Sequence, residues 1–327
     1  MLIGSMGVKS ADCSSDDLPM DDLDTRIRLK AFSFVDELCR RYGTALPAEI
    51  LRLGFDFEGS RVPLISPQGI FKPAILPEVP ISITTVPVVE GKPRPYDDEI
   101  GTDGLMRYRY RGKDPTHHDN VGLRLAMQRN IPLIYFYGLV PGRYAAVWPV
   151  YIVGDDPYTL TFSVEIGEKQ SLLPRSDEDH SELIAEPNTR SYLTVSMQRR
   201  LHQQSFRWRV LEAYRQCCAI CRLRHAELLE AAHILPDGHP KGEPWVSNGL
   251  SLCKLHHAAF DAQILGIRPD LVVEIRKDIL EESDGPLLIH GLKEWHNRKL
   301  VVIPHATRLR PRADFLEERF ELFRKAG

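Results

Sequence analysis

Four side chains between positions 218 and 256 have the type and spacing of a zinc site. Cys218 and Cys221 are separated by two residues, and Cys253 and His256 repeat this spacing further along the chain. Two such pairs separated by a loop can enclose a tetrahedral Zn²⁺ ion. Cys217 directly precedes Cys218 and is an alternative ligand, but the two-residue spacing favours Cys218. The pattern therefore predicts one structural zinc ion held by three thiolates and one imidazole.

A second set of polar residues lies between and just after these pairs. His233, Asn248 and His257 occur in the order His, Asn, His, and Asp261 follows His257 by four positions. On a helix, two residues four positions apart share one face. An imidazole and a carboxylate side by side suit a hard divalent cation, so the spacing predicts a separate metal site at His257 and Asp261.

The stretch from Cys218 to Asp261 resembles the HNH endonuclease family, whose core is a ββα-metal unit. The motifs that carry the resemblance are A-H-I-x-P, N-G-L-x-L-C and H-H-x-x-F-D, nested with the two zinc pairs. The resemblance implies that His233 is the general base, which takes a proton from the water that attacks a phosphodiester. An imidazole suits this role because its unperturbed pKa is about 6.5. Asn248 matches the residue that braces the loop holding that base.

The same resemblance implies a catalytic divalent ion, Mg²⁺, Mn²⁺ or another. His257 and Asp261 match the metal-binding positions, where one cation stabilises the developing charge and the leaving oxygen. Glu230 matches an acidic residue that supports a ligand without coordinating the metal. Many relatives carry Asp or His directly before the base, where this chain has Ala232. Metal binding therefore rests on His257 and Asp261 alone, or a nearby acid must help.

Composition sets the broad class. A length of 327 residues suggests roughly two domains, and 43% hydrophobic with 27% charged residues is ordinary for a globular protein. No apolar run is long enough to span a membrane and no signal peptide is evident, so we expect a cytoplasmic protein. Four of the six cysteines cluster at 217–253, which indicates a metal site in a reducing compartment. The net charge is −3, but the segment from Arg190 to His225 contains eight arginines and a single acidic residue, Glu212. This basic stripe is suited to phosphate contacts.

The first half of the chain predicts helices followed by a curved sheet. Residues 1–20 are small and acidic and predict a disordered tail. Apolar residues near a 3.6 period predict a helix over 21–41, and 47–53 suggests a second, shorter one. Short apolar runs then alternate with Gly, Pro and Asp, which predicts a compact β-barrel or strongly curved sheet. The runs are 62–65, 81–89, 106–110, 132–137, 144–153 and 159–164, with one helix expected over 120–128.

Within this half, a Tyr-acid stretch from Tyr96 is followed by D-G, Y-x-G, D-N and P-L-I. The order is similar to that of the SRA (SET and RING associated) family, which reads modified cytosine in DNA by flipping the base. The resemblance implies that Tyr96 and Tyr110 stack on the flipped base and that Asp98 binds its exocyclic amine. Asp97 or Glu99 could replace Asp98. In the alternative interpretation, Tyr108 and Tyr110 share one face of a strand and belong to the core.

The remaining segments complete the domain plan. Polar residues at 167–188 predict a linker, 190–216 predicts a helix that carries the basic stripe, and 313–325 predicts a closing amphipathic helix. The predicted fold class is α+β, with an N-terminal SRA-like curved β-barrel domain and a C-terminal zinc-stapled ββα-metal (HNH) domain. The boundaries are a tail at 1–20, a modified-DNA recognition domain at 21–165, a linker at 166–190 and the endonuclease domain at 191–327.

Together the two resemblances imply a modification-dependent restriction endonuclease of the McrA type. It would recognise 5-methylcytosine or 5-hydroxymethylcytosine in double-stranded DNA by base flipping and hydrolyse a phosphodiester nearby. One ββα-metal site cuts one strand, so a homodimer is a possible assembly. Two alternatives remain open: an HNH nuclease whose first domain reads sequence or another modification, and a non-catalytic zinc-stapled DNA-binding protein.

Overall fold

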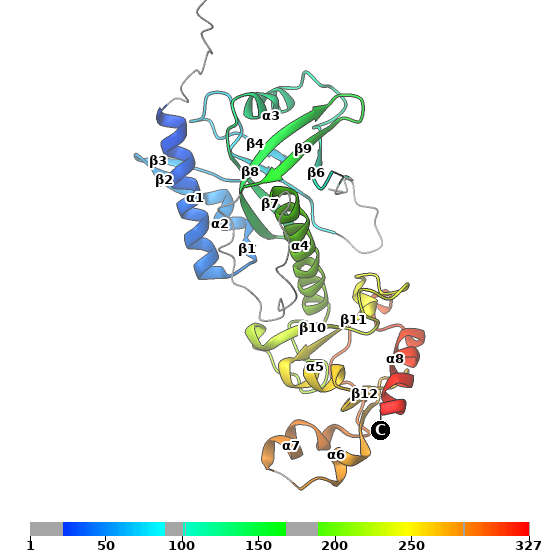
Figure 1. The fold of residues 1–327 in the computed structure, drawn as a ribbon. Helices are drawn as coiled ribbons and strands as arrows, with labels where there is room; N and C mark the ends of the chain where they lie inside the picture. Colours follow the sequence, from blue (N-terminus) through cyan, green and yellow to red (C-terminus); the bar gives the residue numbers. More distant parts are fainter. Residues whose placement is uncertain (1–21, 89–100, 102, 168–188, 284, 327) are drawn as a thin grey trace, which may run out of the picture.

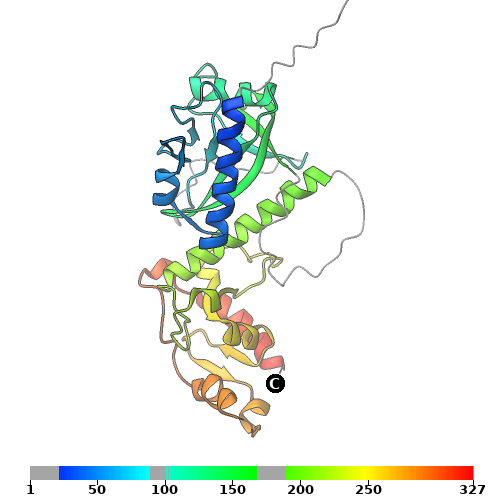
Figure 2. The ribbon, with the colours of Figure 1, turned by 90° about the vertical axis from the view of Figure 1, so that its left-hand side faces the viewer.

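The long helix α4 (Thr189–Ala213) joins an N-terminal and a C-terminal group of elements (Figures 1 and 2). The computed structural model describes residues 22–88, 101, 103–167, 189–283 and 285–326. The predicted tail at 1–20 and most of the predicted linker at 166–190 lie outside these ranges. Helices and strands occur in both groups, so the predicted α+β class is confirmed.

A curled sheet forms the centre of the N-terminal part. Its strands follow the order β4-β5-β7-β8-β9-β6, and β1 pairs with β8. β5 and β7 run parallel, while the other pairs are antiparallel. A register shift between Ile152 and Gly154 lets the long strand β8 bend, and the sheet curls into half of a barrel. The strands are β1 (Leu46–Pro47), β4 (Ile70–Phe71), β5 (Ser82–Thr84), β6 (Met106–Arg109), β7 (Leu133–Val140), β8 (Arg143–Asp156) and β9 (Thr161–Ile166).

Each apolar run that predicted a strand overlaps one, although β3 (Ser60–Val62), β5 and β6 are shorter than their runs. The hairpin strand β3, which pairs with β2 (Phe55–Phe57), stops before Pro63, a residue without an N–H to donate. Strand β5 ends at Thr84, although the Thr85 N–H still donates to the carbonyl of Phe136 in β7 at 3.0 Å. β1 and β4 have two residues each, too short for an alternating pattern to reveal them.

Both faces of the sheet are covered, which explains why every residue of β7 is buried. Ile134 and Phe136 point into a core shared with α1 (Asp22–Tyr42) and α2 (Ala48–Leu53). Tyr135 and Tyr137 point into a second core, which includes residues of α3 (His118–Gln128) and α4. The three helices predicted in this half are thus confirmed at nearly their predicted bounds.

Helix α1 is held to the sheet by an apolar face and by one buried ion pair. Ile27, Ala31 and Val35 are fully buried at helical spacing. Arg28, only 1% exposed, pairs with Asp24 and donates to the carbonyls of Val79, Pro80 and Pro132. Burial lowers the pKa of Arg28, and the Asp24 carboxylate opposes that shift. These bonds fix the helix to the loops before β5 and β7.

Helix α4 contributes to the cores of both parts. Met197 and Leu201 are buried in the N-terminal core, while Phe206 and Val210 are buried in the C-terminal one. The helix was expected to reach residue 216 but ends at Ala213, and the backbone of Arg215 and Gln216 adopts positive φ angles of 56° and 52°. Figure 1 shows α4 running from the sheet to the elements below it.

The C-terminal part begins with a hairpin followed by a helix, the predicted ββα order. Strand β10 (Leu229–His233) pairs antiparallel with β11 (Gly249–Cys253), and α5 (Lys254–Asp261) follows at once. A second hairpin, β12 (Leu265–Ile267) with β13 (Val273–Ile275), packs beside α5 and the closing helix α8 (Ala313–Ala326). The remaining helical segments are η2 (Ala226–Leu228), η3 (Val246–Asn248), α6 (Lys277–Glu281), α7 (Pro286–Gly291), η4 (Lys293–Trp295) and η5 (Thr307–Leu309).

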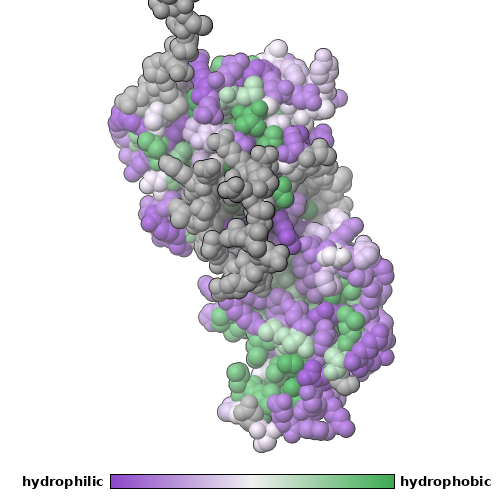
Figure 3. Space-filling model, in the orientation of Figure 1, coloured by the Kyte–Doolittle hydropathy of each residue, from purple (hydrophilic) through white to green (hydrophobic). Residues whose placement is uncertain are grey.

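The face drawn in Figure 3 is mostly hydrophilic over the C-terminal part, with hydrophobic residues gathered towards its lower end. Helix α7 lies at that end and carries Leu287 and Ile289, which are 71% and 42% exposed. Within the described ranges, none of the helices combines the length and the apolar character that crossing a membrane requires.

Candidate active site and metal centre

The four predicted zinc ligands come together from three parts of the chain. The metal-binding atoms of Cys218, Cys221, Cys253 and His256 all lie within 4.8 Å of one another. His256 Nδ1 lies 3.4 Å from the Cys218 sulfur and 3.1 Å from that of Cys253, and the sulfurs of Cys221 and Cys253 are 3.9 Å apart. Three sulfurs and one imidazole nitrogen at these distances fit the donor set of a tetrahedral zinc site. The cluster could therefore hold zinc.

The choice between the two neighbouring thiols is settled by where each points. Cys218 joins the cluster, whereas the Cys217 sulfur is directed to the carbonyl of Arg215 at 3.2 Å. The other ring nitrogen of His256, Nε2, lies 2.8 Å from the carbonyl of Gly291 in α7. A bond of this kind fixes the ring so that Nδ1 faces the metal. No sequence signal pointed to Gly291, which lies 35 positions from the histidine.

The zinc-cluster residues shift one another's pKa values. Burial alone would lower the pKa of His256, but hydrogen bonds with Cys221 and Cys253 raise it to about 9. Hydrogen bonds with Cys218, Cys221 and His256 make the pKa of the Cys253 thiol fall far below its usual value, against the effect of burial. The arrangement already favours a thiolate next to an imidazolium, so a bound metal cation would release a proton from His256.

The second predicted metal site is built by a strand and a helix. His257 on α5 lies with Nδ1 2.6 Å from Oε2 of Glu230 on β10 and with Nε2 3.2 Å from Oδ2 of Asp261. When Nδ1 donates to Glu230, the lone pair of Nε2 faces the carboxylate of Asp261. A nitrogen and an oxygen donor side by side fit a divalent cation. Asp261 is 59% exposed at its side chain, which leaves room for water and a phosphate oxygen.

Few other protein ligands are available at this second site. Ala232, which stands where many relatives have a ligand, is fully buried and has no donor atom. In the described part of the chain, the groups of three or more potential ligands are the zinc cluster and one N-terminal cluster, so no third residue joins His257 and Asp261 there. A cation here would take its remaining ligands from water and substrate, the pattern of a catalytic site.

One basic residue that the sequence did not indicate also reaches Asp261. Arg319 on α8 donates to the Phe260 carbonyl at 3.0 Å and lies 3.4 Å from Oδ1 of Asp261. Its guanidinium also lies over the Phe260 ring, 4.7 Å from the centroid. Burial lowers the pKa of Arg319, and Asp261 opposes that shift. Arg319 therefore holds the end of α5 and shares the carboxylate of Asp261 with any metal bound there.

His233 lies at the end of β10, opposite Gly249 of β11. Its Nε2 atom is buried and has no hydrogen-bond partner among the described residues. Burial lowers the pKa of His233; the nearby Asp237 and Asp261 oppose this effect and His257 adds to it. A lowered pKa keeps the imidazole neutral at neutral pH, the form that can accept a proton.

Asn248 ties together the two ends of the loop between the strands. Its side-chain amide accepts from the Leu235 N–H at 2.9 Å and donates to the carbonyls of Leu235 and Glu243 at 3.0 and 3.2 Å. Its own carbonyl accepts from the Ile234 N–H at 2.9 Å. These bonds satisfy a fully buried amide and hold the backbone directly after His233.

Two arginines of the predicted phosphate-binding stripe donate hydrogen bonds to backbone carbonyls of the protein itself. Arg207 donates to the carbonyls of Ala226 and Leu229, both at 2.8 Å. Arg209 donates to the carbonyl of Pro244 at 2.9 Å. These two side chains hold α4 against the elements around His233, and the N–H groups that bind these carbonyls are not available to phosphates.

The predicted base pocket is described only at Tyr110, because Tyr96 and Asp98 lie outside the described residues. Tyr110 is 3% exposed and stacks on Phe162, with ring centroids 4.5 Å apart. Its hydroxyl donates to Asp155, which also pairs with Arg124 at 2.6 Å. Burial, followed by the bond to Asp155, raises the pKa of Tyr110. This position favours the core interpretation, and the role in base binding stays a prediction.

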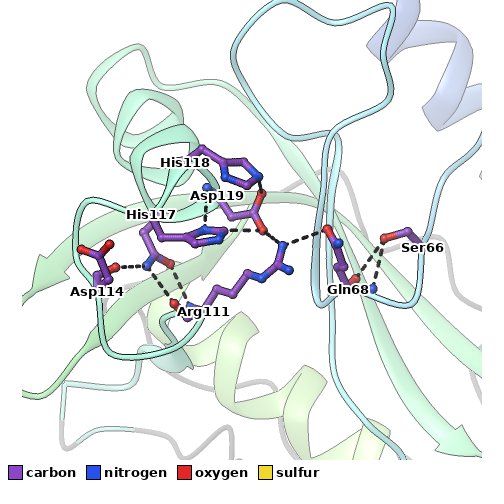
Figure 4. Close-up of polar contacts among 8 residues, drawn as sticks. Ser66, Gln68, Arg111, Asp114, His117, His118 and Asp119 are labelled. Carbon is purple, nitrogen blue, oxygen red and sulfur yellow. Dashed lines mark hydrogen bonds and ion pairs between the residues drawn. The ribbon is translucent and has the colours of Figure 1, made fainter.

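A second group of potential metal ligands lies at the start of α3 (Figure 4). His118 Nε2 lies 3.0 Å from Oδ1 of Asp119, and His117 Nδ1 accepts from the Asp119 N–H at 3.2 Å. The other carboxylate oxygen pairs with Arg111, which also donates to Gln68 at 2.8 Å. The side chain of Asp119 is 7% exposed and both of its oxygens already have partners, whereas that of Asp261 is 59% exposed, so Asp119 offers no open oxygen to a cation. The group is better explained as a polar clamp on the loop from 111 to 119.

Comparison with known proteins agrees with the C-terminal geometry. A family model described as HNH endonuclease matches residues 218–268. No curated protein matches. A solved structure titled "Modification dependent TagI restriction endonuclease" is similar at 16% identity, over 75% of this chain and 82% of that one, with a TM-score of 0.27. That score is too low to establish a common fold across the whole chain.

The family match covers the two zinc pairs, the hairpin and α5. The C-terminal part is thus an HNH endonuclease domain, and the protein is an endonuclease.

Proposed function

We propose that the protein is a modification-dependent restriction endonuclease that hydrolyses phosphodiester bonds in double-stranded DNA carrying modified cytosine. The observation that carries the hydrolytic half is the convergence of His233 with the His257–Asp261 pair on one hairpin and helix, next to a cluster that could hold zinc. These groups have the types that proton abstraction and cation binding require, and they lie inside the matched HNH segment.

In the proposed reaction, the neutral imidazole of His233 accepts a proton from a water molecule as the water oxygen attacks phosphorus and the bond between phosphorus and the leaving oxygen breaks. Its burial keeps the ring unprotonated before the step. Asn248 holds the backbone that follows the ring, and Glu230 orients His257 through Nδ1. His257 Nε2 and the Asp261 carboxylate would hold Mg²⁺ or Mn²⁺, which supplies positive charge for the phosphate and the leaving oxygen.

The zinc cluster has a structural task in this proposal. Cys253 ends β11 and His256 lies in the first turn of α5, directly before His257. Cys218 and Cys221 attach the end of α4 and its following turn to the same point. Zinc bound there would fix the angle between the hairpin and α5, and with it the position of His257 relative to His233.

The recognition half rests on the sequence resemblance to modified-cytosine readers. Tyr96 and Asp98 carry this half, because Tyr110 is 3% exposed and one face of its ring already stacks on Phe162, so a base could stack on it only if the ring became exposed. A flipped base is held by stacking and by hydrogen bonds at its edge, which offset the few kcal/mol of extruding it. 5-Methylcytosine and 5-hydroxymethylcytosine are the proposed marks. A second copy of the chain would allow both strands to be cut.

The buried position of Tyr110 favours a second candidate for the N-terminal part. In that candidate the endonuclease is the same, but the N-terminal part reads sequence or another modification. The two candidates differ in one observable property, which is whether methylation or hydroxymethylation of cytosine increases cleavage of an otherwise identical DNA.

One plasmid prepared in unmodified, methylated and hydroxymethylated forms tests both halves. With Mg²⁺ or Mn²⁺, we expect cleavage of at least one modified form and little cleavage of the unmodified form, and His233→Ala should cut none of them. Equal cleavage of all three forms would remove the recognition half. Cleavage by His233→Ala at the native rate would remove the assignment of the base.

A further inference from the structure

The ring of Phe206 lies flat against the imidazole of His233. The two ring centroids are 4.1 Å apart and the planes differ by 15°. Phe206 is 2% exposed and belongs to α4, outside the segment that matches the HNH family. The Nε2 atom of His233 has no hydrogen-bond partner among the described residues, so the stacked ring is a contact that can restrain the plane of the imidazole.

The partner strand leaves space for this ring. Gly249 lies opposite His233 in the hairpin, and a Cβ atom placed on it would lie 2.9 Å from Cζ of Phe206 and 2.5 Å from Cγ2 of Val210. Such distances are shorter than real Cβ contacts, so a side chain at position 249 would push α4 away from the hairpin. The absence of a side chain at Gly249 therefore lets Phe206 reach His233.

The position of Phe206 along α4 is fixed on both sides. Ser205, one residue before it, donates to the Leu139 carbonyl in the N-terminal sheet at 3.4 Å. Arg207, one residue after it, donates to the carbonyls of Ala226 and Leu229 beside β10 at 2.8 Å. Helix α4 thus cannot slide or turn at this point without breaking bonds to both parts of the protein.

We propose that Phe206 is a positioning residue for His233, holding the imidazole plane at the angle needed to accept a proton from the attacking water. This inference rests on the proposed role of His233 as the base. Because α4 also packs on the N-terminal sheet, the restraint on the catalytic ring comes from a helix that both parts of the protein hold in place. A ring whose Nε2 atom has no hydrogen bond to fix it needs such a restraint, since rotation of the ring would move the nitrogen that accepts the proton away from the water.

The test compares variants of position 206 with and without an aromatic ring. Phe206→Leu keeps a large apolar side chain but removes the ring. Phe206→Tyr keeps the ring. Phe206→Ala removes the ring and most of the side-chain volume. Val210→Ala is the matched control, because Val210 is a fully buried core residue of the same helix that lies one turn further on. The substrate is a supercoiled plasmid in the cytosine form that the native protein cuts, with Mn²⁺. Each variant is measured for single-turnover cleavage rate, DNA affinity, zinc content and melting temperature.

We expect Phe206→Leu to lower the cleavage rate by on the order of 10- to 100-fold, the range for a misplaced catalytic group. DNA affinity and zinc content should stay at the native level, and Phe206→Tyr should restore the rate. Gly249→Ala should show the same loss of rate. Val210→Ala should lower the melting temperature with a far smaller change in rate.

The inference is overturned if Phe206→Leu cuts at the native rate, or if Phe206→Leu and Val210→Ala lose rate only in proportion to their melting temperatures. His233→Ala separates this failure from that of the proposed function. If His233→Ala is inactive while Phe206→Leu is fully active, the base assignment stands and the positioning role falls. If His233→Ala cuts normally, the base assignment fails and the role of Phe206 fails with it.

Discussion

Glu230 and His257 lie on different elements, and Oε2 of the first is 2.6 Å from Nδ1 of the second. Strand β10 thereby fixes the ring orientation of a histidine on α5. Glu230→Gln keeps the shape of the side chain but removes the charge that stabilises the Nδ1 proton. We expect the Mn²⁺ concentration that gives half-maximal cleavage to rise by about 10- to 100-fold, as for other partners of metal-ligating histidines.

The control for this prediction is Glu227→Gln, an exposed acid in the preceding turn. It should leave the Mn²⁺ dependence unchanged. If Glu230→Gln and native protein require the same Mn²⁺ concentration, the bond to His257 has no part in metal binding.

The zinc cluster should stabilise the C-terminal part. Cys221→Ser removes one thiolate, and structural zinc in small modules contributes on the order of 10 kcal/mol to folding. We expect loss of zinc from the purified protein and a lower melting temperature of the C-terminal part. Cys217→Ser is the matched control, because the neighbouring Cys217 sulfur points to the Arg215 carbonyl instead of the cluster. Native protein that contains no zinc would contradict the prediction.

The candidate site was predictable from the sequence where the residues that form it are close together in the chain. The two zinc pairs have spacings of three positions and the His257–Asp261 pair has a spacing of four, and the β10–β11 hairpin brings the two zinc pairs together. Glu230 was expected as a supporting acid, but its partner atom was not specified. The helices and most strands could be predicted for the same reason, because their periodic patterns are local.

Contacts that depend on tertiary packing could not be predicted. Phe206 was identified only as one apolar position of a helix, and nothing in its neighbours indicated a histidine 27 positions later. Arg319 reaches Asp261 across 58 positions. The Tyr110 ring could be assigned to a strand, but whether its face met a core or a ligand depended on Phe162 and on the sheet's curl.

The ion pair under α1 should be a large contributor to the stability of the N-terminal part. Asp24→Asn leaves Arg28 buried at 1% exposure without a counter-charge. Breaking one partner of a buried pair costs about 3–5 kcal/mol, so we expect a clear fall in the melting temperature. Asp36→Asn is the control, because it removes a solvent-exposed helix pair with Arg40. A similar small effect of both changes would contradict the assignment.

The pH dependence of cleavage should reflect the buried position of His233. Its pKa is lowered, chiefly by burial, and a general base works only when neutral. Cleavage should therefore rise with pH through a midpoint below about 6.5, the usual value for histidine, and be constant above it. Asp237→Asn removes a charge that raises this pKa, so the midpoint should move to lower pH still. The measurement is single-turnover cleavage between acidic and neutral pH with saturating Mn²⁺, and a midpoint above that of free histidine would contradict the prediction.

Tyr110→Phe separates the core role of this residue from a role in reading DNA. The change keeps the ring stacked on Phe162 and removes the hydroxyl that donates to Asp155, while Arg124 still pairs with that carboxylate. The hydroxyl also accepts from Arg124 Nη2 at 3.3 Å, so we expect a loss of about 1–3 kcal/mol in the free energy of unfolding, the usual contribution of two hydrogen bonds. The ratio of affinities for modified and unmodified DNA should not change, because the hydroxyl is already occupied inside the protein.

Tyr96→Ala should reduce that ratio by roughly tenfold, since one base–aromatic stack contributes about 1–3 kcal/mol. Binding of both duplexes over a range of salt concentrations measures the ratio apart from phosphate contacts. A lost preference in Tyr110→Phe with a native melting temperature would place the hydroxyl in the base pocket after all.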